Sequence, residues 1–239
     1  MKKLIALLMF ITLLQLPVYA QYEMGWDAKF AIGGGFTPGW IIPEVDEINK
    51  MMNGLEFSSS GFFATGGAGY ISIAVVKNIR IGMMGLGGSM TETNEGLEAK
   101  YSLSALGFTA EYTFPFIPLV AVSAGIVVGG GTTTLNLHRF DPGYNADWND
   151  IWSEIQSSSN TVNNFSRKIS NSYFTVIPTL NIDIPLYRFF AFRIGGGYQI
   201  AMGDNWELDN GQKISNIPSG LSSNAVFIQT GIFIGYFNY

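Results

Sequence analysis

Apolar and polar residues alternate along most of the chain with the period of two that is typical of half-buried β-strands. The alternation is clear over 106–112, where Leu, Phe, Ala and Tyr take turns with Gly, Thr and Glu. Similar segments recur along the chain, each ended by turn-forming or charged residues. The pattern predicts about eight strands, at 22–36, 61–76, 79–90, 100–114, 119–135, 172–184, 188–202 and 224–239.

The connections between these segments are alternately long and short. The short ones fall at 77–78, 115–118 and 185–186, and the long ones at 37–60, 91–98, 136–171 and 203–223. Outer-membrane barrels have short periplasmic turns, long outer loops and an even number of strands. The sequence therefore predicts an all-β, antiparallel, up-and-down transmembrane barrel of about eight strands with four long outer loops. A hairpin hidden in the third loop would raise the number to about ten.

Composition supports a membrane barrel over a water-soluble protein. Only 13% of the residues are charged and 47% are hydrophobic, whereas about a quarter of the residues in a typical soluble domain are charged. After the N-terminal segment, no apolar run is long enough for a membrane-spanning helix. A closed barrel is the other structure that can cross a bilayer, because all its backbone groups are paired. The formal net charge of −5 argues against a nucleic-acid partner.

The N-terminus has the features of a secretory signal peptide. Lys2 and Lys3 precede an apolar run over 4–16, and the segment ends at Ala20. We expect removal of residues 1–20 and a single barrel domain over 21–239. The chain has no cysteine, which excludes a lipoprotein anchor and disulfide bonds.

The last segment carries the most specific pattern, in which Gly231, Phe233, Gly235, Phe237 and Tyr239 alternate up to a terminal aromatic residue. With this ending, the chain resembles the small outer-membrane β-barrel superfamily of OmpA-, OmpX- and OmpW-like proteins. The resemblance implies the outer membrane of a Gram-negative cell envelope, contact with outer-membrane lipid, and recognition of the strand ending at Tyr239 by the barrel-insertion machinery. The opposite phase of this strand is equally apolar, so the pattern leaves open which face meets lipid.

Several charged residues alternate with apolar ones inside the predicted strands, opposite the apolar face. If that face meets lipid, these side chains point into the barrel and have to pair with one another, because an unpaired buried charge is costly. We predict a structural network in the lumen made by Asp27, Lys29, Arg80, Glu111, Asp183 and Arg193. The alternative interpretation is a narrow, gated path for ions.

Two loops have helical patterns. Over 43–55, Pro43 suits a first helical turn, and one face would hold Val45, Ile48, Met52 and Leu55. We interpret this segment as a plug of the barrel mouth or a contact helix for a partner. A second helix is predicted near 147–155.

Catalytic and metal sites are not indicated. His138 is the one histidine, and no nucleophile motif accompanies it. The acidic loops lack the spacing of a calcium-binding loop, and no motif indicates a cofactor. Aromatic residues gather near both ends of the strands, as in interfacial girdles, and we assign Phe62 and Tyr173 to the girdle at the loop end.

These observations favour an outer-membrane barrel that has a structural or surface-interaction role and is not an enzyme. One alternative is a narrow channel or passage protein for small or apolar solutes, with the 43–55 helix as its plug. Another is a soluble periplasmic ligand binder of the lipocalin kind, in which the apolar residues would face inward. The sequence names neither a ligand nor a surface partner.

Overall fold

The computed structural model describes residues 30–52, 54–73, 76, 78–114, 120–139, 165–187 and 189–238. Several expectations lie outside this part of the chain, namely the signal peptide, the charged pair Asp27 and Lys29, the helix near 147–155 and the terminal Tyr239. Within the described part, no helix has the length and apolar character needed to cross a membrane.

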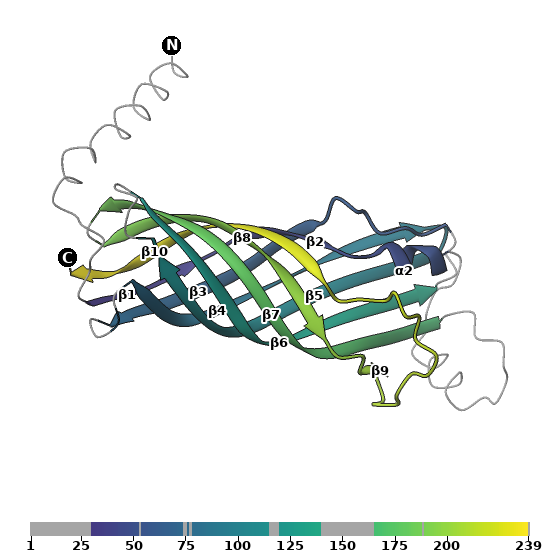
Figure 1. The fold of residues 1–239 in the computed structure, drawn as a ribbon. Coiled ribbons are helices and arrows are strands. Elements are labelled where there is room, and N and C mark those ends of the chain that lie inside the picture. Colours follow the sequence, from purple (N-terminus) through teal and green to yellow (C-terminus); the bar gives the residue numbers. More distant parts are fainter. Residues whose placement is uncertain are drawn as a thin grey trace, which may run out of the picture.

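Antiparallel strands form a closed ring, elongated along its axis (Figure 1). The elements of the wall are β1 (Phe30–Phe36), β2 (Gly39–Pro43), β3 (Phe62–Ile73), β4 (Ile79–Asn94), β5 (Leu97–Thr113), β6 (Ala121–Arg139), β7 (Phe165–Tyr187), β8 (Phe190–Met202) and β10 (Ala225–Asn238). Because β1 and β2 occupy the same place between β3 and β10, the ring has eight strands. The short β9 (Trp206–Leu208) pairs with β7 outside the ring. The predicted antiparallel barrel of about eight strands is confirmed.

A break at Thr37 and Pro38 divides the first strand of the ring into β1 and β2. Proline has no backbone N–H and cannot donate to a neighbouring strand. The wall stays joined there because the Thr37 N–H donates to the Gly66 carbonyl at 2.8 Å and the Thr230 N–H donates to the Pro38 carbonyl at 2.9 Å. The predicted loop over 37–60 was therefore wrong at its start, since Gly39–Pro43 continues the wall.

The predicted long loop over 91–98 was also wrong. Strands β4 and β5 pair up to Asn94 and Leu97, and only Glu95 and Gly96 connect them. Both connecting residues have positive φ, at 42° and 81°, as a tight two-residue hairpin turn requires. Strands β6 and β7 likewise extend into the predicted third loop, to Arg139 and from Phe165.

The outward face of the ring is apolar over a broad zone. Phe108, Ile234 and Leu106 leave 69%, 61% and 58% of their surface exposed. In β10 the outward face includes Ile228, Ile232 and Ile234, whereas Phe233 is buried inside. The structure thus shows which face of the last strand points outward, a question that the sequence left open. An apolar exterior of this extent is favourable in contact with hydrocarbon and unfavourable in contact with water.

Two aromatic residues that the sequence assigned to the loop-end girdle point inward instead. Phe62 and Tyr173 are only 4% and 6% exposed. Both lie in the inward phase of their strands, whereas Trp40 and Phe36 do project outward. The girdle assignment was wrong for these two residues because it used their position along the strand without their phase.

The two ends of the barrel differ. The start of β1 and the end of β10 lie at the end with short turns, and helix α2 (Asp46–Met51) and β9 lie at the opposite end (Figure 1). Helix α2 is shorter than the predicted 43–55, and Pro43 closes β2 rather than opening the helix. Pro43 is tolerated at this strand end because a proline at an edge or terminus removes no essential ladder bond.

Candidate functional site

The lumen near the short-turn end holds four of the six charged residues predicted to form a network. Arg80 comes from β4, Glu111 from β5, Asp183 from β7 and Arg193 from β8, and all four are buried. Arg80 lies directly opposite Glu111 in the ladder, and Asp183 lies opposite Arg193. The inward phase of the strands and the register of the ladder therefore bring these four side chains together.

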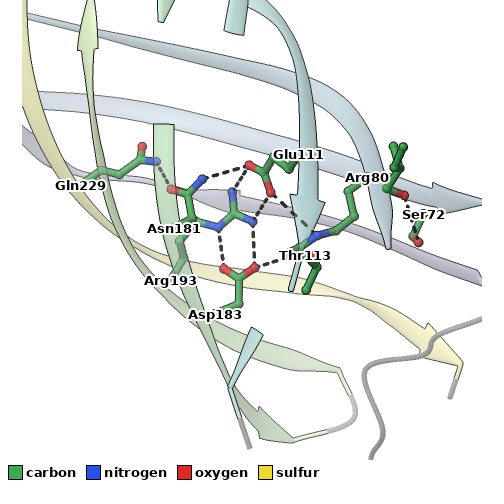
Figure 2. Close-up of polar contacts among 9 residues, drawn as sticks. Ser72, Arg80, Glu111, Thr113, Asn181, Asp183, Arg193 and Gln229 are labelled. Carbon is green, nitrogen blue, oxygen red and sulfur yellow. Dashed lines mark hydrogen bonds and ion pairs between the residues drawn. The ribbon is translucent and has the colours of Figure 1, made fainter. Parts of the chain in front are cut away.

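Arg193 is the centre of the network (Figure 2). Its Nε and Nη2 donate to the two carboxylate oxygens of Asp183 at 2.6 and 2.9 Å. Its Nη1 and Nη2 donate to the two oxygens of Glu111 at 2.8 and 3.0 Å. One guanidinium thus binds two carboxylates in bidentate fashion, a geometry that arginine supports and lysine does not.

Arg80 completes the charge balance. Its Nη1 donates to Asp183 Oδ2 at 2.6 Å, and its Nη2 donates to Thr113 Oγ1 at 2.9 Å. Its Nε lies 3.8 Å from Glu111 Oε2. The two arginines and two carboxylates sum to zero charge, which lowers the cost of burying them.

Amide and aromatic side chains enclose the charged groups. Asn181 donates to Glu111 Oε1 at 3.1 Å, and Gln229 donates to Asn181 Oδ1 at 3.3 Å. The guanidinium of Arg193 lies 4.7 Å from the ring centre of Phe233 and 5.5 Å from that of Tyr70. Cation–π contacts of this kind replace part of the hydration that the arginine loses.

Glycines make room for the network. A Cβ atom at Gly125 of β6 would lie 2.8 Å from Cγ of Glu111, and one at Gly195 of β8 would collide with the side-chain oxygen of Asn181. Both positions therefore need glycine for close approach.

Besides the contacts between neighbouring strands, such as Arg193 with Asp183, several interactions of the network cross the lumen. Arg80 on β4 reaches β7, Arg193 on β8 reaches β5, and Gln229 on β10 reaches β7. An eight-stranded barrel is just wide enough for side chains to fill it. The cross-section at this level is thus occupied by paired charges. Arginine keeps its proton in proteins, so the network is poorly suited to relay protons.

A second polar layer lies farther toward the loop end. Gln199 Nε2 donates to the Tyr173 hydroxyl at 2.9 Å and to the Ser223 carbonyl at 2.8 Å. Asn171 Nδ2 donates to Ser223 Oγ at 3.2 Å. These contacts attach the segment before β10 to the inner wall.

An apolar layer under helix α2 fills the loop end. Val45, Ile48 and Leu55 are buried in one cluster with Tyr101, and Met52 packs partly buried against it. The four residues of the predicted plug face therefore all contact the apolar interior. Tyr101 is fully buried and makes an edge contact with Phe57, with ring centres 5.8 Å apart.

Glu44 ties the first loop to the last. Its carboxylate accepts hydrogen bonds from Ser222 Oγ at 2.6 Å, from the Tyr198 hydroxyl at 2.7 Å and from Asn224 Nδ2 at 3.2 Å. The bond from Ser222 is the largest cause of a lowered pKa of Glu44, and those from Tyr198 and Asn224 add to it against a partial desolvation.

Among the residues that the structure describes, His138 does not form part of an assembled catalytic group. It lies exposed on the outward face of β6, in register with Glu98 of β5 and Ser166 of β7. No hydrogen bond joins these three described side chains, whereas a nucleophile needs a base within hydrogen-bonding distance. In the part of the chain that the structure describes, no group of His, Asp or Glu residues is arranged to hold a metal ion.

Sequence reasoning missed Asn181, Gln229, Tyr70 and Phe233 as members of the network. Asn181 was detectable, because it shares the inward phase with Asp183 two residues later. Gln229 was also detectable, as an amide in a mostly apolar predicted strand. The aromatic contacts had no comparable signal, because they depend on the stagger of β3 against β10.

Solved structures similar to this chain are outer-membrane proteins. A major outer membrane protein from Thermus thermophilus has a TM-score of 0.53 at 10% identity, covering 86% of this chain and 99% of that chain. Neisserial surface protein A has a TM-score of 0.43 at 8% identity, covering 87% and 97%. Ail, the attachment invasion locus protein of Yersinia pestis, has a TM-score of 0.41 at 8% identity, covering 88% and 99%.

Comparison of sequences gives no closer relationship. No protein-family model matches the chain, and no curated protein matches it. The likeness is therefore one of architecture, in which antiparallel strands close into a ring with an apolar exterior. The chain has the fold of the small outer-membrane β-barrel proteins.

Proposed function

We propose that this protein is an integral outer-membrane barrel with a closed lumen, and that it acts through its loop end as a structural or surface-contact protein. The observation that carries the proposal is the set of hydrogen bonds from Arg193 and Arg80 across the lumen. Opening a path at this level would separate buried opposite charges, which costs several kcal/mol per uncompensated ion.

The loop end adds a second obstruction to passage. Helix α2 and the residues that follow it place Ile48, Leu55 and Phe57 in the interior beneath the first loop. The loop is fixed on both sides, by Glu44 to the segment before β10 and by Asn94 Nδ2, which donates to the Gly54 carbonyl at 2.6 Å. A first loop fixed in this way can present a constant shape to a partner.

The outward apolar face supports the membrane location. Closed barrels satisfy every backbone group internally, and their lipid-facing side chains are apolar. We infer that export, removal of a signal peptide after Ala20 and insertion through the terminal strand precede this state. A lipocalin-like binder would require the opposite arrangement, with polar groups outside and an apolar interior throughout.

Two measurements on the same preparation test the proposal. Membranes from expressing cells are washed with urea, and the protein is run unboiled and boiled on a gel. We expect retention in the membrane and a different mobility of the unboiled band. The purified, folded protein is then inserted into planar bilayers beside a large porin as positive control, and we expect no stepwise currents at high voltage.

The contrary results are distinct. Regular current steps from the folded protein would show a channel and contradict the closed lumen. Release by the urea wash, with no difference between unboiled and boiled bands, would contradict the membrane location.

A further inference from the structure

The outward face of β4 to β7 changes character abruptly toward the loop end. The last level with large apolar side chains includes Leu106 and Phe174, which are 58% and 50% exposed. The ladder places only small residues at the next two levels. The first of these holds Gly87, Ser104, Thr132 and Ser172, and the second holds Ser89, Ser102, Thr134 and Ser170.

Two lysines lie at the level beyond these hydroxyl groups. Lys100 of β5 and Lys168 of β7 both pair with Asn136 of β6, one from each side. Strands are spaced about 4.8 Å apart, so the two lysine Cα atoms lie about 10 Å from each other. Both side chains are exposed. We call the two hydroxyl levels together with Lys100 and Lys168 the hydroxyl–lysine face.

Neither lysine has a partner of opposite charge in the described residues. The ion pairs found there involve Lys50, Arg80 and Arg193. The carboxylate that shares the outward face of β5 is that of Glu98, one level farther from the apolar zone and opposite His138. Within the described part of the chain, no carboxylate therefore competes with a ligand for these two positive charges, on a protein whose net charge is −5.

The opposite side of the barrel lacks this arrangement in the residues that the structure describes. There a large, outward, apolar residue lies near the loop end of each strand. Trp40, Phe63, Met202 and Val226 are 43%, 58%, 46% and 42% exposed. The hydroxyl–lysine face is therefore confined to one side and is not a general rim of the barrel.

Its position selects the chemistry of the ligand. The face begins where the apolar exterior ends, which is the level of lipid headgroups in a membrane barrel. Lysine ammonium groups bind phosphate and are favoured near anionic lipid surfaces. Serine and threonine hydroxyls both donate and accept hydrogen bonds, as the hydroxyls of a sugar do. Long lysine stems can lean toward the headgroup level.

We propose that the hydroxyl–lysine face binds the phosphorylated sugar headgroup of an outer-leaflet glycolipid. Lys100 and Lys168 contact phosphate, and the serines and threonines below them contact the sugar. This inference rests on the membrane location proposed above and names the lipid class that this side of the barrel selects. The occupant is a lipid because the face is continuous with the apolar exterior.

The test compares two double variants of the full chain that remove equal charge. Lys100→Gln with Lys168→Gln alters the face, and Lys50→Gln with Lys213→Gln alters the loops. Diphosphorylated lipid A is titrated into each folded protein in detergent micelles, and bound lipid is counted by native mass spectrometry. Since a lysine near an anionic surface contributes about 1 kcal/mol, we expect roughly fivefold weaker binding for each lysine removed from the face, about 25-fold for the pair. The loop variant is expected to change binding less than twofold.

Three results would overturn the inference. Equally weakened lipid binding in both double variants would mean that binding depends only on the net charge of the protein. Equally tight binding of dephosphorylated lipid A would show that the lysines do not contact phosphate. Tight, lysine-dependent binding of the soluble inositol hexakisphosphate would indicate a soluble anion site rather than a lipid site. The unboiled gel band and urea wash of each variant report membrane integration separately, so a failure of the proposed function is distinguishable from these results.

Discussion

Replacement of Arg193 by alanine tests the network that closes the lumen. The substitution removes two hydrogen bonds to Asp183 and two to Glu111. Asp183 keeps its 2.6 Å bond from Arg80, and Glu111 keeps a 3.1 Å bond from Asn181. The interior then carries one uncompensated negative charge. Breaking a buried ion pair from one side costs about 3–5 kcal/mol, so we expect a loss of about that size in the free energy of unfolding.

The loss can be measured by urea titration of the protein in phosphatidylcholine vesicles, with the folded fraction read from the unboiled gel band. Arg193→Lys is expected to be intermediate, about 1–3 kcal/mol, because it keeps the charge and loses the bidentate geometry. Arg139→Ala is the matched control, since Arg139 is exposed at the loop end of β6 and should cost less than about 0.5 kcal/mol. A loss for Arg193→Ala no larger than that of the control would refute the reasoning.

Three further substitutions test the packing and the loop contacts. Gly125→Ala places a Cβ atom 2.8 Å from the network and should destabilise the barrel by about 1–3 kcal/mol, whereas outward Gly130→Ala should be tolerated; equal unfolding midpoints would contradict this. Ile48→Ala should cost about 2–4 kcal/mol because Ile48 is buried, against little for exposed Met51→Ala in the same urea assay. The lowered pKa of Glu44 means that its contribution is present at neutral pH and lost as the pH falls below its usual 4.5 and through the folded value. The protection of helix α2 against hydrogen exchange, relative to the intrinsic exchange rate at each pH, should therefore fall in acid in the native chain, and Glu44→Gln should remove that dependence.

The period of two in the sequence was sufficient to predict the wall, because one face of each strand meets apolar surroundings. It failed where strands leave the apolar zone. Thr91, Glu92 and Thr93 belong to β4, but their polar side chains on both faces are those of a loop. Gly39–Pro43 was missed for another reason, since Pro38 ends the regular pattern although the strand resumes after it.

The charged members of the site were predictable from phase, but their contacts were not. Glu111 and Asp183 are on strands separated by β6, and their common binding to Arg193 depends on how the strands are staggered around the ring. Stagger is a property of the closed barrel and leaves no local signal in one sequence. The plug face of Val45, Ile48, Met52 and Leu55 was recognisable, whereas the length of helix α2 was overestimated because Pro43 suits a strand end as well as a helix start.

The most direct test of the central claim uses the absence of cysteine from the chain. Phe108 is replaced by cysteine and spin-labelled, and collisions of the label with oxygen and with a water-soluble nickel complex are compared in reconstituted vesicles. Phe108 lies within the apolar outward face and is 69% exposed, so we predict frequent collisions with oxygen and few with the nickel complex, as for a label in hydrocarbon. Frequent collisions with the nickel complex would place this face in water and contradict the account.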